Sequence, residues 1–109
     1  MGLFQAKNKT IQVLQKGMEE KNRVITKLYE EIGELYCEQY IDADLDVSRE
    51  VNDKCDRIIV LRGEIEEGQL AILSEMGLKR CSGCDKENPS DHTFCSACGL
   101  RFTDDGGSE

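Results

Sequence analysis

Tryptophan is absent from this chain of 109 residues, and aromatic residues make up only 6% of it. Charged residues, in contrast, account for 33%. So few large apolar side chains among so many charges argue against a thick globular core and favour exposed helices. The chain has one proline, so long helices can run without interruption.

Other absences exclude whole classes of protein. There is no apolar run of about 18 residues, so we expect no membrane span. Residues 1–6 lack the apolar core of a signal peptide, and Ala6 stands where a myristoylation site needs Ser or Thr. We therefore expect a cytoplasmic protein with reduced thiols. The net charge of -8 disfavours binding nucleic acid over the whole surface, because phosphate contacts need clustered basic residues.

Catalytic patterns are also missing. The chain has one histidine, and it shows no Ser-His-Asp set, no phosphate-binding glycine loop and no converging pair of carboxylates. We expect no enzyme, no catalytic residue and no small-molecule substrate.

Four cysteines near the C-terminus carry the strongest signal: Cys81-x2-Cys84-x10-Cys95-x2-Cys98. Each Cys-x2-Cys hook presents two thiolates from one tight turn, which is what a tetrahedral zinc ion needs. Four thiolates fill the coordination sphere, so the sequence predicts one structural zinc ion. The residues after the hooks, Asp85 and Gly99, suit the left-handed backbone such turns require. His92 is expected to be a solvated loop residue and not a ligand.

Residues 79–102 resemble the short bacterial zinc-ribbon module, which they share through Asn88-Pro89 and through Phe94-Cys95-Ser-Ala-Cys98-Gly99. The match departs at Asp85, where the module usually has Gly. With Leu35-Tyr36-Cys-Glu38-Gln39, the whole chain is similar to uncharacterised bacterial zinc-ribbon-domain proteins that join a helical hairpin to such a ribbon. The resemblance implies a four-cysteine metal site and no activity.

A second resemblance is to the Ran-binding-protein type of zinc finger. Its spacing is met by the four cysteines together with Asn88. The tryptophan of that family is replaced by Lys79, and its ubiquitin-reading Thr-Phe pair after Cys84 is absent. This resemblance would imply binding of RNA or ubiquitin.

A heptad pattern over residues 4–39 predicts a first helix over 4–41. A weaker pattern predicts a second helix over 47–76, ended by Gly77 in a left-handed cap. The short join, Ile41–Asp46, is rich in N-cap residues, so the helices should be antiparallel neighbours. The core positions expected in the two helices are Ile11, Leu14, Met18, Ile25, Leu28, Ile32, Leu35, Val51, Ile58, Leu61, Ile65 and Ile72.

The fold class that follows is mainly α: a long antiparallel, coiled-coil-like helical hairpin with a small C-terminal zinc ribbon. We predict a hairpin domain over residues 1–78, a zinc ribbon over 79–102 and a disordered acidic tail over 103–109. Leu3 and Phe4 are expected to contact the ribbon near Phe94, Leu100 or Phe102.

Charge is unevenly distributed along the chain. Residues 1–27 hold six basic and two acidic residues, whereas residues 28–53 hold nine acidic and one basic. Folding back in the join should place the basic stretch beside acidic residues of the second helix, Glu64 among them. The aspartates of the join resemble a calcium loop, but Val47 stands where such a loop needs Gly, so we interpret them as helix caps.

Some apolar residues lie outside the heptad rows and predict a surface for self-association or for a partner helix, unless they close over their own hairpin. They are Val13, Val24, Tyr29, Tyr36, Ile59 and Leu73. The expected function is a non-enzymatic zinc-binding interaction or adaptor protein that binds a protein partner or forms a homodimer. The alternative is a nucleic-acid-associated regulator binding through basic residues of the ribbon, and a calcium or redox sensor is a third hypothesis. Cys37 and Cys55 should be reduced, because packed helices hold them too far apart for a disulfide.

Overall fold

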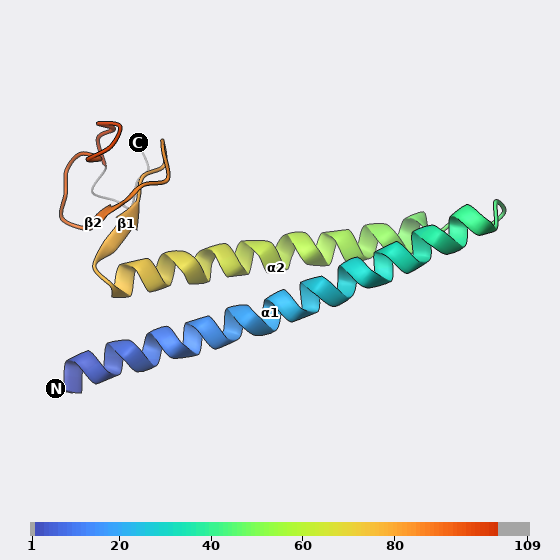
Figure 1. Ribbon diagram of the computed structural model, residues 1–109, viewed down its shortest axis with the longest axis horizontal. Coiled ribbons are helices and arrows are strands. Elements are labelled where there is room, and N and C mark those ends of the chain that lie inside the picture. The colour runs from blue at the N-terminus through green and yellow to red at the C-terminus, as the bar shows by residue number, and fades with distance from the viewer. Residues whose placement is uncertain (1, 103–109) are drawn as a thin grey trace. The chain divides into compact units, whose positions relative to one another are not determined.

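Two long helices are followed by a small two-stranded sheet in the computed structural model, which describes residues 2–102 and the side chains from residue 8 onward (Figure 1). The elements are α1 (Gly2–Ile41), α2 (Ser48–Glu75), β1 (Leu78–Arg80) and β2 (Glu87–Pro89). The predicted class, a mainly α helical hairpin with a small C-terminal module, is confirmed. The predicted tail and the side chains of Leu3 and Phe4 lie outside the described residues.

The chain divides into two compact units. One is formed by residues 12–68, and the other combines the first residues of α1 with the chain from Gln69 onward. The domain boundary predicted after residue 78 falls inside the latter unit and stays a prediction. Neither described helix carries an apolar stretch of the length that crossing a bilayer requires.

The core of the hairpin comes from the predicted heptad rows. Ile25 and Leu28 of α1 and Ile58 of α2 are buried and pack together. Three partly buried residues close around them: Ile32, Leu61 and Ile65. All six were expected at core positions, because spacings of three and four residues keep side chains on one side of a helix.

The turn between the helices is held by side chains that bond to backbone N–H groups. Gln39 Oε1 accepts from the N–H of Val47 at 3.0 Å, and Val47 itself is buried. Asp42 Oδ1 accepts from Asp44 N–H at 3.1 Å. Asp46 Oδ1 accepts from the hydroxyl of Ser48 at 2.6 Å and from its N–H at 3.0 Å, and these bonds lower the pKa of the Asp46 carboxyl. The interpretation of these aspartates as caps is confirmed.

Opposite charges face each other across the hairpin, and one of the two pairs, Lys21 with Glu64, is of the predicted kind. Lys21 Nζ lies 3.9 Å from Glu64 Oε1, and Lys54 Nζ donates to Glu31 Oε1 at 2.9 Å. The bond from Lys54 holds the pKa of the Glu31 carboxyl below its usual value. Exposed pairs of this kind stabilise little, so their main effect is on which surfaces pair.

The end of α2 has the predicted glycine cap. Gly77 has φ 74°, and its N–H donates to the carbonyl of Ser74 at 3.0 Å. The Gly77 carbonyl accepts from the N–H of Ser90 at 2.8 Å, directly after β2. The left-handed residue therefore both ends the helix and turns the chain into the sheet.

We predict that Ile58→Ala destabilises the hairpin by about 2–5 kcal/mol, because it removes buried methyl groups and leaves a cavity. Val60→Ala is the matched control, since Val60 is 58% exposed, and it should change stability by about 0.5 kcal/mol or less. Urea unfolding followed by circular dichroism measures both. Equal losses in the two variants would contradict the packing described.

Candidate metal centre

The module after α2 is organised by a short antiparallel pairing of β1 and β2. Leu78 lies opposite Pro89, Lys79 opposite Asn88 and Arg80 opposite Glu87. The first cysteine hook follows β1 directly, so the pairing of β1 with β2 positions the start of this hook.

The first hook is a tight turn. Cys81 N–H donates to the carbonyl of Lys86 at 2.9 Å, and Asp85 N–H donates to the carbonyl of Cys81 at 2.8 Å. The N–H of Gly83 points at Cys81 Sγ at 3.3 Å. Asp85 has φ 65°, so the predicted left-handed residue after the hook is confirmed.

The second hook repeats this pattern. Cys95 N–H donates to the carbonyl of Leu100 at 2.8 Å, and Gly99 N–H donates to the carbonyl of Cys95 at 3.0 Å. The N–H of Ala97 points at Cys95 Sγ at 3.3 Å. Gly99 has φ 79°, also as predicted. A bridge between Phe94 and Arg101 closes the base of this turn. Two turns of one geometry therefore present their thiols to a common space.

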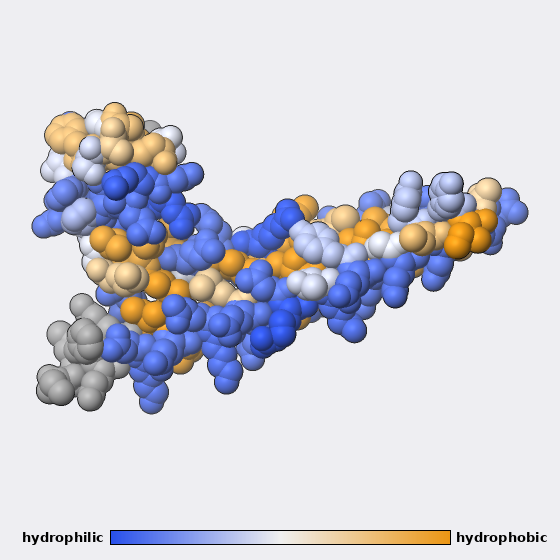
Figure 2. Space-filling model, in the orientation of Figure 1, coloured by the Kyte–Doolittle hydropathy of each residue, from blue (hydrophilic) through white to orange (hydrophobic). Residues whose placement is uncertain are grey.

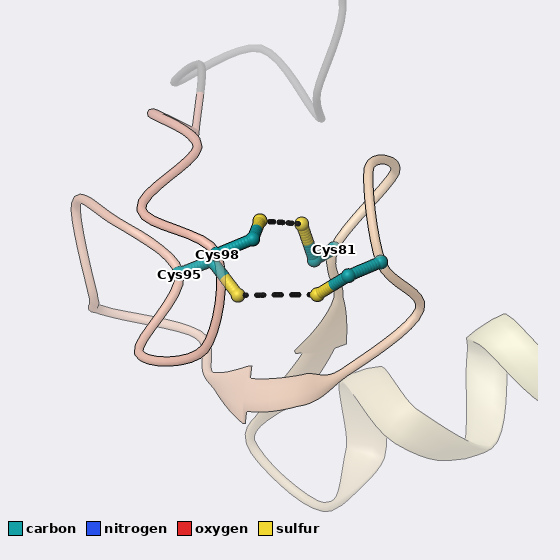
Figure 3. A group of neighbouring side chains, drawn as sticks. Cys81, Cys95 and Cys98 are labelled. Carbon is teal, nitrogen blue, oxygen red and sulfur yellow. Dashed lines mark hydrogen bonds between the residues drawn. The ribbon is translucent and has the colours of Figure 1, made fainter.

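The four sulfur atoms meet between the hooks. Cys81 Sγ lies 3.5 Å from Cys98 Sγ, and Cys84 Sγ lies 3.6 Å from Cys95 Sγ. All four lie within 4.8 Å of one another. Figure 3 shows Cys81 facing Cys98, with Cys95 turned toward the same space. A tetrahedron with metal–sulfur bonds of about 2.3 Å has sulfur–sulfur edges of about 3.8 Å, so this group could hold one metal ion.

Each hook contributes one buried and one exposed cysteine. Cys81 and Cys95 are buried, whereas Cys84 and Cys98 are exposed. Leu100 covers the first hook closely: a Cβ added to Gly83 would lie 3.2 Å from its Cδ2 atom and 3.7 Å from Cys81 Sγ. Because Gly83 has no side chain, the Leu100 side chain and the Cys81 thiol can both lie close to it.

Backbone N–H groups aimed at sulfur favour the thiolate at Cys95. The N–H of Cys98, with that of Ala97 and the side chain of Asn88, outweighs the loss of hydration and lowers the pKa of the Cys95 thiol to about 6. A thiolate, and not a thiol, is the form that binds metal. Cys95 is thus the member of the group prepared to take an ion at neutral pH.

The neighbouring thiols are shifted the other way. The Lys86 N–H lowers the pKa of Cys84, but donation of its proton to Cys95, together with lost hydration and the other cysteines, raises that pKa to about 12. The Leu100 N–H lowers the pKa of the Cys98 thiol, but the hydrogen bond with Cys81, the loss of hydration and the hydrogen bond with Cys95 together outweigh it, so the pKa is above its ordinary value. Without a cation the group shares protons between sulfur atoms, since crowded thiolates repel.

Asn88 ties the two hooks together from a fully buried position. Its Nδ2 donates to the carbonyl of Lys86 at 3.1 Å and toward Cys95 Sγ at 3.5 Å. Its Oδ1 accepts from the N–H of Ser96 at 3.0 Å and from the Ser96 hydroxyl at 3.1 Å. These bonds join Lys86, two residues after the first hook, to Cys95 and Ser96 of the second hook, which makes Asn88 a positioning residue for the thiols.

The basic residues of the module are only partly available to a ligand. Lys79 Nζ donates to the carbonyl of His92 at 2.7 Å and lies 4.1 Å from the ring centre of Phe102. Lys79 stands where the Ran-binding-protein finger has tryptophan, and here it holds the module's own chain. Lys86 and Arg101 are exposed.

The structure brings together the four cysteines that the spacing singles out. His92 is exposed and lies outside the group, as expected. Cys37 and Cys55 are free and exposed, also as expected. Within residues 8–102, no other group of three or more potential metal-ligating His, Cys, Asp or Glu side chains is found, the aspartates of the turn included. The positioning role of Asn88 was not predicted from the sequence, although the sequence shows this residue before Pro89 and between the two hooks.

Comparison with models of known protein families finds no match, and neither a curated protein nor a solved structure matches the chain.

We predict that Asn88→Ala lowers the affinity of the site for metal by about 10- to 100-fold, because the hooks lose the residue that fixes their separation. Glu87→Ala is the matched control, since Glu87 is the exposed neighbour on β2. Competition with a chromophoric chelator measures the affinity of both. An Asn88→Ala affinity equal to that of the control would show that Asn88 does not position the thiols.

Proposed function

We propose that the chain is a non-enzymatic, zinc-binding interaction protein of the cytoplasm. In this proposal the four-cysteine group holds one structural zinc ion, and the helical hairpin binds a protein partner or a second copy. The observation that carries the proposal is the meeting of four sulfur atoms within 4.8 Å of one another.

The chemistry of the donors favours zinc. A tetrahedral set of four thiolates suits Zn²⁺, and iron is the main competitor for such a set. Four protein donors also leave no open coordination position for water or a substrate carbonyl, so this ion would stabilise the module and take no part in a reaction. A module with so few buried apolar side chains needs such a contribution.

The hairpin supports an interaction role because it leaves large apolar side chains in water. In the part of the chain described, exposed examples on the helices include Val13, Tyr36, Tyr40, Ile41, Ile59 and Val60. Two packed helices bury only one side of each, so a further helix against the hairpin would add apolar burial that the isolated hairpin lacks.

Nucleic acid is the alternative partner. The exposed Lys86 and Arg101 on the module favour it, whereas the net charge of -8 and the engagement of Lys79 within the module oppose it. Binding to nucleic acid that collapses between low and high salt would support this alternative.

We predict one equivalent of zinc per chain in purified protein, and loss of that zinc in the Cys95→Ser/Cys98→Ser variant. Mass spectrometry under native conditions and elemental analysis measure the content. Cys37→Ser/Cys55→Ser is the matched control, because these exposed thiols lie outside the group. Full binding in both variants, or an iron-containing coloured protein, would overturn the assignment.

Acid should release the ion. Protons compete with the metal for thiolates, so we expect zinc to leave below about pH 5 and to return on neutralisation. A zinc-sensitive dye measures the release, and circular dichroism should show that the helices persist. Zinc retained by the folded chain at pH 3 would contradict binding through four thiolates.

The interaction role is tested by recovering partners from native cells with the intact protein and with Cys95→Ser/Cys98→Ser. Recovery of the same partner by both places the binding surface on the hairpin. Loss of the partner with the zinc would place it on the module, and no specific partner, self included, would overturn the role.

A further inference from the structure

The hairpin formed by residues 12–68 has two unlike faces. The ion pairs of Lys54 with Glu31 and of Lys21 with Glu64 lie on one of them. On the other, Arg62 donates a hydrogen bond to the hydroxyl of Tyr29, and its guanidinium carbon lies 5.8 Å from the centre of that ring. Helical spacing places these two sets on opposite sides of the core, since residues that share a face recur every three or four positions.

The face of Tyr29 carries an uncharged row along α1, which we call the tyrosine stripe. Its members recur at helical spacing and are Gln15, Met18, Asn22, Thr26, Tyr29, Gly33, Tyr36 and Tyr40. None is charged, although 33% of the chain is. The stripe holds every tyrosine of the chain, and Tyr36 and Tyr40 are 62% and 82% exposed. Figure 2 shows orange side chains along the line between the two helices, with blue side chains on the helices beside them.

The part of α2 on this face is less uniform. At helical spacing its row contains Asn52, Cys55, Ile59, Arg62 and Glu66, and Ile59 is 64% exposed. Arg62 is directed at Tyr29. The two helices together therefore present a broad surface of aromatic, aliphatic and polar side chains with few charges.

Gly33 on this face has no explanation within the hairpin. An added Cβ at Gly33 would meet nothing within 4 Å, and the residue has no positive φ. A glycine inside a helix is destabilising relative to alanine. Close approach of another helix would use the space that this glycine leaves open.

Charges follow the tyrosine stripe along one edge. The residues directly after its first six members are Lys16, Glu19, Arg23, Lys27, Glu30 and Glu34, and the uncharged Cys37 and Ile41 follow the last two. This row is mainly basic up to residue 27 and acidic beyond it. The turn end of the hairpin continues the acidic half, with nine acidic residues and one basic residue between 28 and 53.

We propose that the tyrosine face binds a second copy of this chain in antiparallel orientation, with α1 against α1 of the partner copy. This inference rests on the interaction role proposed above and names the partner. In the antiparallel arrangement the basic half of each charged row meets the acidic half of the other. A parallel pair would set the two acidic turn ends against each other. The product is a four-helix bundle, in which both tyrosine faces leave water.

Light scattering and sedimentation of the zinc-loaded full chain test the inference. The wild type should be a dimer, and Tyr36→Glu/Tyr40→Glu should be a monomer with unchanged zinc content. Val13→Glu/Val60→Glu is the matched control, because these residues are 64% and 58% exposed away from the tyrosine face, and it should remain a dimer. Far-ultraviolet circular dichroism verifies that each variant is folded.

Charge reversal tests the orientation. In an antiparallel dimer, Lys16→Glu/Arg23→Glu should weaken self-association by about tenfold or more, and adding Glu30→Lys/Glu34→Lys in the same chain should restore it. A parallel dimer would be unaffected by the first pair of substitutions, since like residues would still face each other. That result would overturn the proposed arrangement.

Gly33 supplies an independent readout. Gly33→Leu should abolish dimers, whereas Gly17→Leu should not, because Gly17 has equally open space but lies off the tyrosine face. A wild-type chain that holds one zinc and stays monomeric at high concentration would overturn this inference and leave the metal centre standing. A chain without zinc would instead overturn the proposed function.

Discussion

Crowding of four sulfur atoms into one small space is the constraint on which the C-terminal module depends. Thiolates at separations near 3.5 Å repel each other, so the arrangement needs either shared protons or a cation between them. The hydrogen bonds that lower the pKa of Cys95 and the proton held by Cys84 describe the first solution. A divalent ion takes the place of the shared protons and forms an attractive bond with each of the four thiolates, which offsets their repulsion. A closed thiolate site and its ion therefore stabilise a fold together.

The spacing of the cysteines was sufficient to predict the site because each hook is a local structure. A turn of four residues with a left-handed residue after it is determined by its own hydrogen bonds, so Asp85 and Gly99 could be assigned without knowing the fold. Asn88 could not be assigned in the same way. Its partners are Lys86, which follows the first hook, and Cys95 and Ser96 of the second, and only the folded module shows that one buried amide reaches them all.

The hairpin could be predicted for a similar reason, because its core also follows from local spacing, and some of its contacts could not. The heptad rows gave the core, since Ile25, Leu28 and Ile58 follow directly from helical spacing. The hydrogen bond from the Val47 N–H to the Gln39 side chain was not foreseen, because the two residues stand eight positions apart on either side of the turn. In the structure the Gln39 amide holds this turn from the end of α1.

The remaining apolar residues show the limit of reading a single heptad row. The sequence placed Tyr29 and Tyr36 outside the core and left open whether they close over their own hairpin. Their exposure of 46% and 62% shows that the hairpin does not cover them, whereas Leu73, which was predicted to belong to the same surface, is buried at 7% exposure, so that part of the prediction is wrong. Exposed tyrosines alone would be ordinary surface residues, but here they lie in one uncharged row of α1 with Gly33, whose open space no described part of the hairpin fills. A helix that tolerates such a glycine loses stability on its own, and association is the process in which that loss can be offset.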